Sequence, residues 1–232
     1  MKIQDINKQC HLLNQSIKHV RFIALLILFT LFTGCAAGTK GVPETSTEAA
    51  PALEGSAVTH FNDGRRGFVI TEVANLDATA RRDFDQAVVL LGEDKYEQAI
   101  VLLEKIVEIS PEVSAPHINL ALAYSKIDKS ELAEAHLKIA LNLISGHPVA
   151  SNEYGLLLRK AGRFEEAKNI YEQSLLIFPD YLPVRRNLGI LCDLYLNNQE
   201  CALTQYEFYG EASPDDKQVK LWISELRLRL GL

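Results

Sequence analysis

Side chains suited to catalysis or metal binding are few in this sequence, and most lie far apart. The chain has six histidines and four cysteines. It contains no His-Glu-x-x-His, Gly-x-Ser-x-Gly or Cys-x-x-Cys motif and no phosphate-binding glycine loop. His117 and His136 could approach each other, but two histidines without further ligands make a poor metal site. We therefore expect no catalytic residue, no metal and no cofactor, and we expect that the protein is not an enzyme.

One cysteine near the N-terminus, Cys35, belongs to a pattern with a different chemistry. The preceding residues begin with a basic stretch and continue with an apolar run, 22–32, that is too short to span a bilayer comfortably. Phe32-Thr33-Gly34 then leads into the cysteine. The pattern resembles a bacterial lipoprotein signal, which implies a signal peptide over 1–34 and lipidation at Cys35. The alternative is an uncleaved anchor helix from about Arg21 to Gly38.

Both alternatives predict that the chain after Cys35 lies outside the cytoplasm. The next residues, Ala36-Ala37-Gly38, lack the aspartate of an inner-membrane retention signal. We therefore expect a lipid-anchored protein on the periplasmic side of the outer membrane. The periplasmic face of the inner membrane is the alternative location.

A period of thirty-four residues runs through the middle of the chain. Small side chains recur at this interval in two series: Ala87, Ala121, Gly155 and Gly189, and then Ala99, Ala133 and Ala167. A small side chain on one helix that faces a small one on the next lets the two backbones come close. Because a single helix pair cannot bury its apolar face alone, such units must stack.

Period, spacing and residue types resemble the tetratricopeptide repeat, a helix–turn–helix unit of this length. The third unit matches best, with Tyr154-Gly155-x-x-Leu158 followed by Gly162-Arg163-Phe164-Glu165-Glu166-Ala167. The resemblance implies an all-α protein, a right-handed α-solenoid of about four helix pairs plus a C-terminal capping helix. The repeats are expected over 80–213, in four units: 80–113, 114–147, 148–181 and 182–213.

The fourth unit departs from the period. Ala202 lies thirty-five residues after Ala167, which predicts one inserted residue in the turn at Asn197-Asn198-Gln199. Cys192 and Cys201 flank this turn. In an oxidising compartment they could form a disulfide, whereas two separately buried thiols are the equally weighted alternative.

The segments before the repeats have different compositions. Residues 35–66 are rich in Ala, Gly, Thr, Ser, Pro and Glu and are expected to form a flexible tether. Residues 67–79 form a lead-in segment, within which Phe68–Val73 has strand-like composition. Asp77 is a candidate N-cap for the first helix.

The segment after the repeats, 214–232, is expected to be the capping helix. Its apolar residues follow helical spacing: Val219, Trp222, Ile223, Leu226 and Leu230. Ser213 is the predicted N-cap and Pro214 the predicted first helical residue. A solenoid needs such a helix because its last repeat would otherwise expose an apolar face.

Charge excludes several partners. The chain has 24 basic and 30 acidic residues, a net charge of −6. The first 34 residues hold four basic and one acidic, so the remainder has 20 basic and 29 acidic residues and a net charge of −9. An acidic domain without a basic stripe argues against nucleic acid and against docking on anionic lipid.

The first helix of each repeat is expected to line a concave groove that binds a protein or peptide segment. An apolar stripe recurs every thirty-four residues: Val88, Leu122, Leu156 and Ile190. Two neighbouring rows run beside it: Phe84, Ile118, Asn152 and Arg186, and then Leu91, Ser125, Arg159 and Asp193. Exposed apolar stripes usually mark binding surfaces. The alternative is that Phe68–Val73 covers the stripe.

The sequence thus predicts a scaffold or adaptor held at the membrane by lipid, which binds a protein segment in envelope, pilus or secretion-system assembly. The architecture resembles pilotins of type IV pili, components of outer-membrane barrel assembly and adaptors for peptidoglycan hydrolases. Nothing in the repeats chooses among these. An inner-membrane scaffold with an uncleaved helix is one alternative, and a cell-wall hydrolase is a weaker one.

Overall fold

The computed structural model describes residues 57–61, 67–72 and 76–232. All of them belong to the unit that spans 49–232. The predicted lipidation site, Cys35, and the predicted signal peptide lie outside the described residues. The described residues form a two-stranded hairpin and nine helices: β1 (Ala57–His60), β2 (Phe68–Thr71), α2 (Ala78–Gly92), α3 (Tyr96–Ile109), α4 (Ser114–Lys126), α5 (Ser130–Leu143), α6 (Pro148–Lys160), α7 (Phe164–Ile177), α8 (Leu182–Leu194), α9 (Gln199–Ala212) and α10 (Lys217–Leu230).

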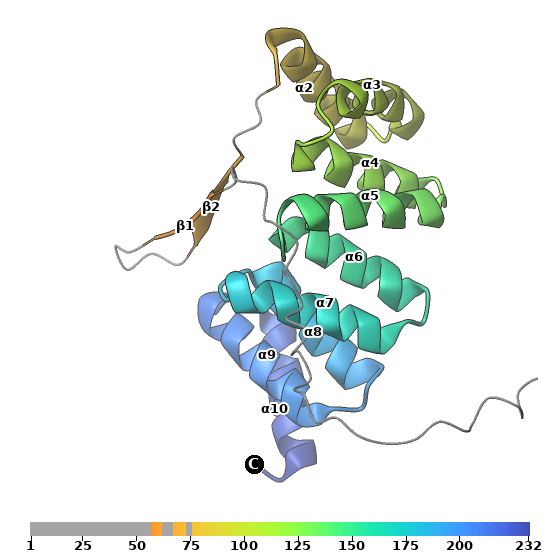
Figure 1. Cartoon of the computed structure of the whole chain (residues 1–232). Coiled ribbons are helices and arrows are strands. Elements are labelled where there is room, and N and C mark those ends of the chain that lie inside the picture. Colours follow the sequence, from red (N-terminus) through yellow and green to blue (C-terminus); the bar gives the residue numbers. More distant parts are fainter. Residues whose placement is uncertain (1–56, 62–66, 73–75) are drawn as a thin grey trace, which may run out of the picture. The chain divides into compact units, whose positions relative to one another are not determined.

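The helices stack as four consecutive antiparallel pairs, followed by α10 (Figure 1). Each second helix also contacts the first helix of the next pair, and α9 contacts α10. The first helices α2, α4, α6 and α8 contact one another as neighbours, so they line one common surface. The predicted all-α solenoid of four helix pairs plus a capping helix is confirmed.

The small residues of the period lie where the helices of a pair come closest. A Cβ atom on Gly155 would lie 2.2 Å from the ring of Tyr171 on α7, and one on Gly189 would lie 2.5 Å from the ring of Tyr206 on α9. Both tyrosines are almost completely buried. The glycines therefore make room for a large aromatic ring from the second helix.

A left-handed residue closes the turn inside every pair. These residues have φ near +60°, a conformation that Asp, Asn and Gly tolerate best: Asp94, Asp128, Gly162 and Asn197. The turn has three residues in the first three pairs and four, 195–198, in the last. The predicted insertion in the fourth unit is confirmed at this turn.

Two predicted N-caps have different outcomes. Asp77 caps α2 as predicted, because its carboxylate accepts hydrogen bonds from the amides of Thr79 and Ala80 at 2.8 and 2.7 Å. The prediction for α10 was wrong. Ser213 ends α9, and Asp216 caps α10 through the amides of Gln218 and Val219. An aspartate next to the true helix start satisfies these amides, so the chain between α9 and α10 forms a turn.

The hairpin begins earlier than the sequence indicated. Residues 57–61, assigned to the tether, form β1 and its end, and β1 pairs antiparallel with β2 from Ala57 opposite Thr71 to His60 opposite Phe68. The strand-like composition at Phe68–Val73 predicted only β2. A lone strand leaves its backbone groups unpaired, and the partner came from a segment whose composition resembles a linker.

Candidate protein-binding groove

The predicted apolar stripe lies on the first helices as expected from their common surface. Val88 on α2 is 46% exposed. Leu122, Leu156 and Ile190, on α4, α6 and α8, are half-buried. Leu122 and Ile190 also pack against the hydrophobic core. Each of the four first helices thus contributes one partly accessible apolar side chain.

The second row is less accessible than predicted. Ile118 and Asn152 are only 6% and 8% exposed, whereas Phe84 and Arg186 are half-buried. The Asn152 side chain accepts a hydrogen bond from Asn187 at 2.8 Å and donates one to Glu153 at 2.9 Å. Ile118 and Asn152 are therefore packing residues, and their prediction as groove contacts was wrong.

Arg159, in the third row, has an unusual environment. Its guanidinium carbon lies 5.8 Å from the ring centre of Tyr195, just after α8. One guanidinium nitrogen, Nη1, is buried and has no hydrogen-bond partner among the described residues. Stacking on an aromatic ring occupies the face of a guanidinium and leaves the N–H groups at its edge for another acceptor.

Arg186 is held in a similar way on the next first helix. Its guanidinium carbon lies 5.4 Å from the ring centre of Trp222 on α10. The nearby carboxylate of Asp193 is taken by Arg229 at 2.9 Å. Within the described part of the chain, neither Arg159 nor Arg186 has a carboxylate at ion-pair distance. The C-terminal half of the groove therefore presents two arginines that lack an anionic partner.

The tyrosines beneath this region are neutral. Burial raises the pKa of Tyr171 and of Tyr206 and outweighs the nearby arginine charges, which lower it. The negative charges of Glu153 and Asp193 act in the same direction as burial. The Tyr171 hydroxyl is buried and has no hydrogen-bond partner among the described residues. Because these phenols stay protonated, they do not supply the missing negative charge to the two arginines.

The hairpin is attached outside the apolar stripe. The ring centre of Phe68 lies 4.6 Å from the ring centre of Phe178 and 6.1 Å from that of Tyr181. Both residues lie between α7 and α8. The carboxylate of Glu72 accepts hydrogen bonds from the amide and hydroxyl of Ser114, at the start of α4, at 2.7 and 2.6 Å. These contacts lie at turns where one pair follows another, and none of them involves a residue of the stripe.

The cysteines of the fourth pair are joined. A disulfide connects Cys192 on α8 with Cys201 on α9, with their Cα atoms 5.9 Å apart. It spans the longer turn of 195–198 and ties the two helices of the pair together. The bridged sulfur atoms contribute no reactive thiol.

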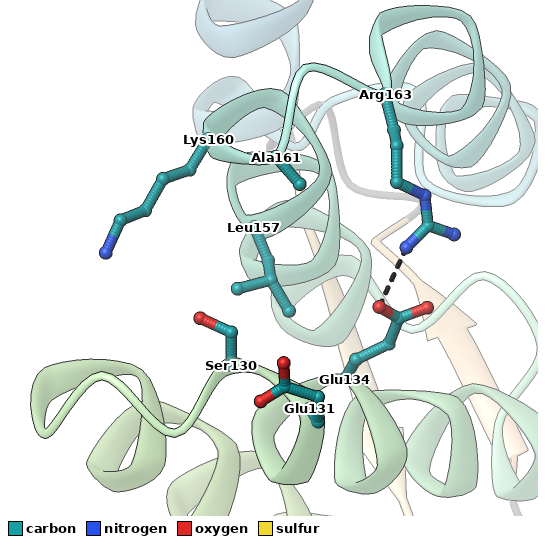
Figure 2. A pocket seen from close by; sticks show the side chains of 7 residues that line it. All are labelled: Ser130, Glu131, Glu134, Leu157, Lys160, Ala161 and Arg163. Carbon is teal, nitrogen blue, oxygen red and sulfur yellow. Dashed lines mark hydrogen bonds and ion pairs between the residues drawn. The ribbon is translucent and has the colours of Figure 1, made fainter. Parts of the chain in front are cut away.

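A hollow on another edge of the solenoid was not predicted, and Figure 2 shows it between the start of α5 and the end of α6. Arg163 forms an ion pair with Glu134 there at 2.8 Å. Partial burial alone would raise the pKa of Glu134, but hydrogen bonds from Lys138, Arg163 and Tyr154 lower it to about 2. A carboxylate so fully paired is a structural ion-pair centre and a poor general acid.

The described residues hold no group of three or more side chains suited to binding a metal ion. None of the described helices is long and apolar enough to cross a bilayer. The histidine pair that the sequence suggested does form, with the Nδ1 atoms of His117 and His136 2.9 Å apart.

Comparison with known proteins agrees with the geometry. A family model described as YpiA-like, C-terminal tetratricopeptide repeats, matches residues 116–180. The chain contains tetratricopeptide repeats. No curated protein sequence matches it.

Solved structures with the same fold are more distant. PilF from Pseudomonas aeruginosa is similar at 24% identity and a TM-score of 0.60, over 66% of this chain and 69% of that one. MamA from Desulfovibrio magneticus RS-1 is similar at 16% identity and a TM-score of 0.58, over 68% of this chain and 88% of that one. At these identities the likeness concerns the fold of the repeat protein alone.

Proposed function

We propose that this repeat protein is a scaffold of the bacterial envelope whose groove binds a segment of another protein. The observation that carries the proposal is the pair of arginines, Arg159 and Arg186, stacked on aromatic rings beside the apolar stripe without a carboxylate partner. A buried guanidinium nitrogen without an acceptor costs free energy. A partner that supplies a carboxylate or backbone carbonyls would recover that cost.

The same arrangement defines the chemistry of the bound segment. Its apolar side chains would cover the stripe from Val88 to Ile190, and burial of apolar area contributes roughly 25 cal/mol per Å². Its acidic side chain or C-terminal carboxylate would meet Arg159 and Arg186, which fixes the direction in which the segment lies. The groove thus suits an extended or helical segment that is apolar at one end and acidic at the other.

The cellular location is part of the proposal. The lipoprotein-like sequence that ends at Cys35 supports a lipid anchor on the periplasmic side of the outer membrane, and the alternative is an uncleaved helix in the inner membrane. A disulfide between Cys192 and Cys201 suits an oxidising compartment. The proposed role is in assembling an envelope, pilus or secretion-system complex, as the resemblance of the sequence to envelope-assembly repeat proteins implies. The role proposed is therefore non-enzymatic.

Quantitative recovery of partners from envelope extracts tests the groove. Val88→Glu places a charge in the exposed end of the stripe, and Arg159→Gln removes the unpaired guanidinium. Leu122 is a poorer choice because it also packs against the core. We expect Arg159→Gln to reduce the recovery of partner proteins about tenfold, because a hydrogen bond to a charged group contributes roughly 1.5–3 kcal/mol. Val88→Glu should reduce it as well, because a bound apolar segment would bury the new charge.

A matched control is Leu176→Glu on α7, where the side chain is 84% exposed and lies on a second helix. This variant should keep every partner. If all three variants retain the same proteins to the same extent, binding does not use the groove and the proposal is wrong.

A further inference from the structure

Helix α10 lies in register with the first helices of the four pairs. α4, α6 and α8 begin at Ser114, Pro148 and Leu182, and α10 begins at Lys217, thirty-five residues after α8. The extra residue is the one inserted in the turn at 195–198. On this register Ser224 takes the small-residue position that Gly155 and Gly189 occupy in α6 and α8. α10 is therefore equivalent to the first helix of a fifth pair.

The face that a second helix covers in each complete pair is open on α10. In α6 this face is buried under α7 and consists of Ser151, Tyr154, Gly155 and Leu158. The equivalent face of α10 consists of Lys220, Ile223, Ser224 and Arg227, of which all but Ile223 are exposed. These four residues, with Leu228 and Leu232, line a hollow of about 550 Å³.

A polar contact between the two helices recurs at one position of this face. This position is the fourth residue of each repeat unit, counted from 80, 114, 148 and 182. In three pairs its side chain bonds to the second helix: Asp83 with Lys105 at 2.6 Å, His117 with His136 at 2.9 Å, and Arg185 with Gln205 at 2.8 Å. Lys220 takes this position on α10. No side chain in the described part of the chain pairs with its ammonium group.

We propose that the open face of α10 binds an amphipathic helix of a partner protein, which completes a fifth pair. The geometry of the complete pairs defines that helix. It places a bulky apolar residue over Ser224, as Tyr171 lies over Gly155, and an acidic residue opposite Lys220. This surface is separate from the groove, so one scaffold can hold two different segments.

Charge argues for a partner protein and against a second copy of this chain. α10 carries four basic residues and one acidic residue: Lys217, Lys220, Arg227, Arg229 and Glu225. Two copies of the open face would bring Lys220 and Arg227 against the same groups of the other copy. Glu207 pairs with Arg227 at 2.6 Å but leaves Lys220 uncompensated. An acidic helix removes this repulsion, whereas a second α10 doubles it.

The probe for this face is a labelled peptide of residues 164–177, the sequence of α7, with Gln173→Glu. In the register of the pairs, position 173 is equivalent to Lys105, which bonds to Asp83. The peptide thus presents Tyr171 to Ser224 and a carboxylate to Lys220. Fluorescence anisotropy with the full chain in detergent should show saturable binding, accompanied by a gain of peptide helicity in circular dichroism.

Three changes distinguish docking on α10 from nonspecific adsorption. Ser224→Trp fills the hollow and should weaken binding at least tenfold. Lys220→Glu should weaken it about fivefold, and a Gln173→Lys peptide should restore binding to that variant, because the charges are exchanged. The groove variants Val88→Glu and Arg159→Gln should leave this binding unchanged, so the two surfaces are tested independently.

Absence of saturable binding overturns the proposal, as does binding that neither Ser224→Trp nor Lys220→Glu alters. Sedimentation equilibrium of the full chain checks the other occupant. A dimer that Ser224→Trp dissociates would show that a second copy covers this face, and this outcome also overturns the proposal. Circular dichroism melting of both variants should match the wild type, since the substituted side chains are exposed.

Discussion

His117 on α4 and His136 on α5 face each other with their Nδ1 atoms 2.9 Å apart. The Nε2 atom of His117 lies 3.1 Å from the carbonyl oxygen of Pro111, which can only accept, so Nε2 carries a proton. In the neutral pair, Nδ1 of His136 therefore donates to Nδ1 of His117. One added proton can be shared between the two rings, but two would place like charges in contact. The pair thus disfavours its doubly charged form.

The buried histidines predict a fold that weakens in mild acid. Burial lowers the pKa of His117, of His136 and of His147, and the neighbouring His117 lowers that of His136 further. The unfolded chain takes up protons near pH 6.5 while the folded chain resists them, so stability is present above that pH and is lost as the pH falls through it. We expect a loss of about 1–3 kcal/mol between pH 7.5 and 5.5, measured by urea unfolding.

His136→Asn provides the matched control for the pH effect, since Asn retains a hydrogen-bonding side chain that does not titrate. This variant should lose a substantial part of the pH dependence. Loss of stability below pH 4.5 has another source. The folded chain lowers the pKa of the Asp77 and Glu134 carboxyl groups, so their ionised forms stabilise the fold and protonation in acid removes this stabilisation. A stability that stays flat from pH 7.5 to 5.5 would contradict the histidine account.

Replacing glycine by alanine should destabilise the fold at two positions and stabilise it at a third. Gly155→Ala would drive a Cβ atom into the Tyr171 ring, which is buried and cannot move aside, so we expect a loss of about 1–3 kcal/mol or more. Gly189→Ala should behave alike against Tyr206. Gly92→Ala, at the end of α2 with open space around it, should stabilise by up to about 1 kcal/mol. Thermal unfolding of the three variants measures both signs.

Local features of the sequence predicted most of the fold. The period that places Gly155 and Gly189 reflects packing between helices adjacent in sequence, so it located the four pairs and even the inserted residue near Asn197. The hairpin partner at 57–60 escaped prediction because its composition resembles that of a linker. Burial of Asn152 depends on Asn187 from the next pair, which the period alone does not show.

The sequence predicted which residues belong to the rows of the candidate groove, but it did not predict which side chains contact them. The sequence indicated Arg159 and Arg186 as the polar end of the groove. It gave no sign that Tyr195 and Trp222 hold their guanidinium groups, because each ring comes from a neighbouring helix or turn. The same reasoning missed the open face of α10, since an exposed leucine such as Leu228 has the same spacing as a buried one.

The disulfide should contribute to stability as well as to geometry. Closing a short loop between Cys192 and Cys201 restricts the unfolded chain, and we expect the double Cys→Ala variant to lose about 2–3 kcal/mol. Thiol labelling of the denatured, unreduced protein provides the chemical check. Two labelled thiols from this pair in protein isolated from the envelope would show that the bridge does not form there.

The lipid anchor remains a prediction from the sequence around Cys35. Cys35→Ala should abolish incorporation of labelled fatty acid and release the repeat domain from the membrane fraction. The mass of the mature wild-type protein separates cleavage before Cys35 from a retained helix. A variant that is still labelled would exclude Cys35 as the lipidation site.

Arg159 should lower the stability of the unbound protein. Its buried Nη1 atom has no acceptor, and leaving such a group unsatisfied costs about 1–3 kcal/mol, partly offset by the contact with Tyr195. Arg159→Met keeps the length of the side chain and removes the unpaired group. We therefore expect its free energy of unfolding to equal or exceed that of the wild type by up to about 1 kcal/mol, while partner recovery falls about tenfold.

Arg163→Met is the matched control, because that guanidinium is fully paired with Glu134 and Glu166 and its loss should destabilise the fold without weakening partner binding. If Arg159→Met destabilises the protein as much as Arg163→Met does, Arg159 is a structural residue, and the proposal that it binds an anionic group in the groove is wrong.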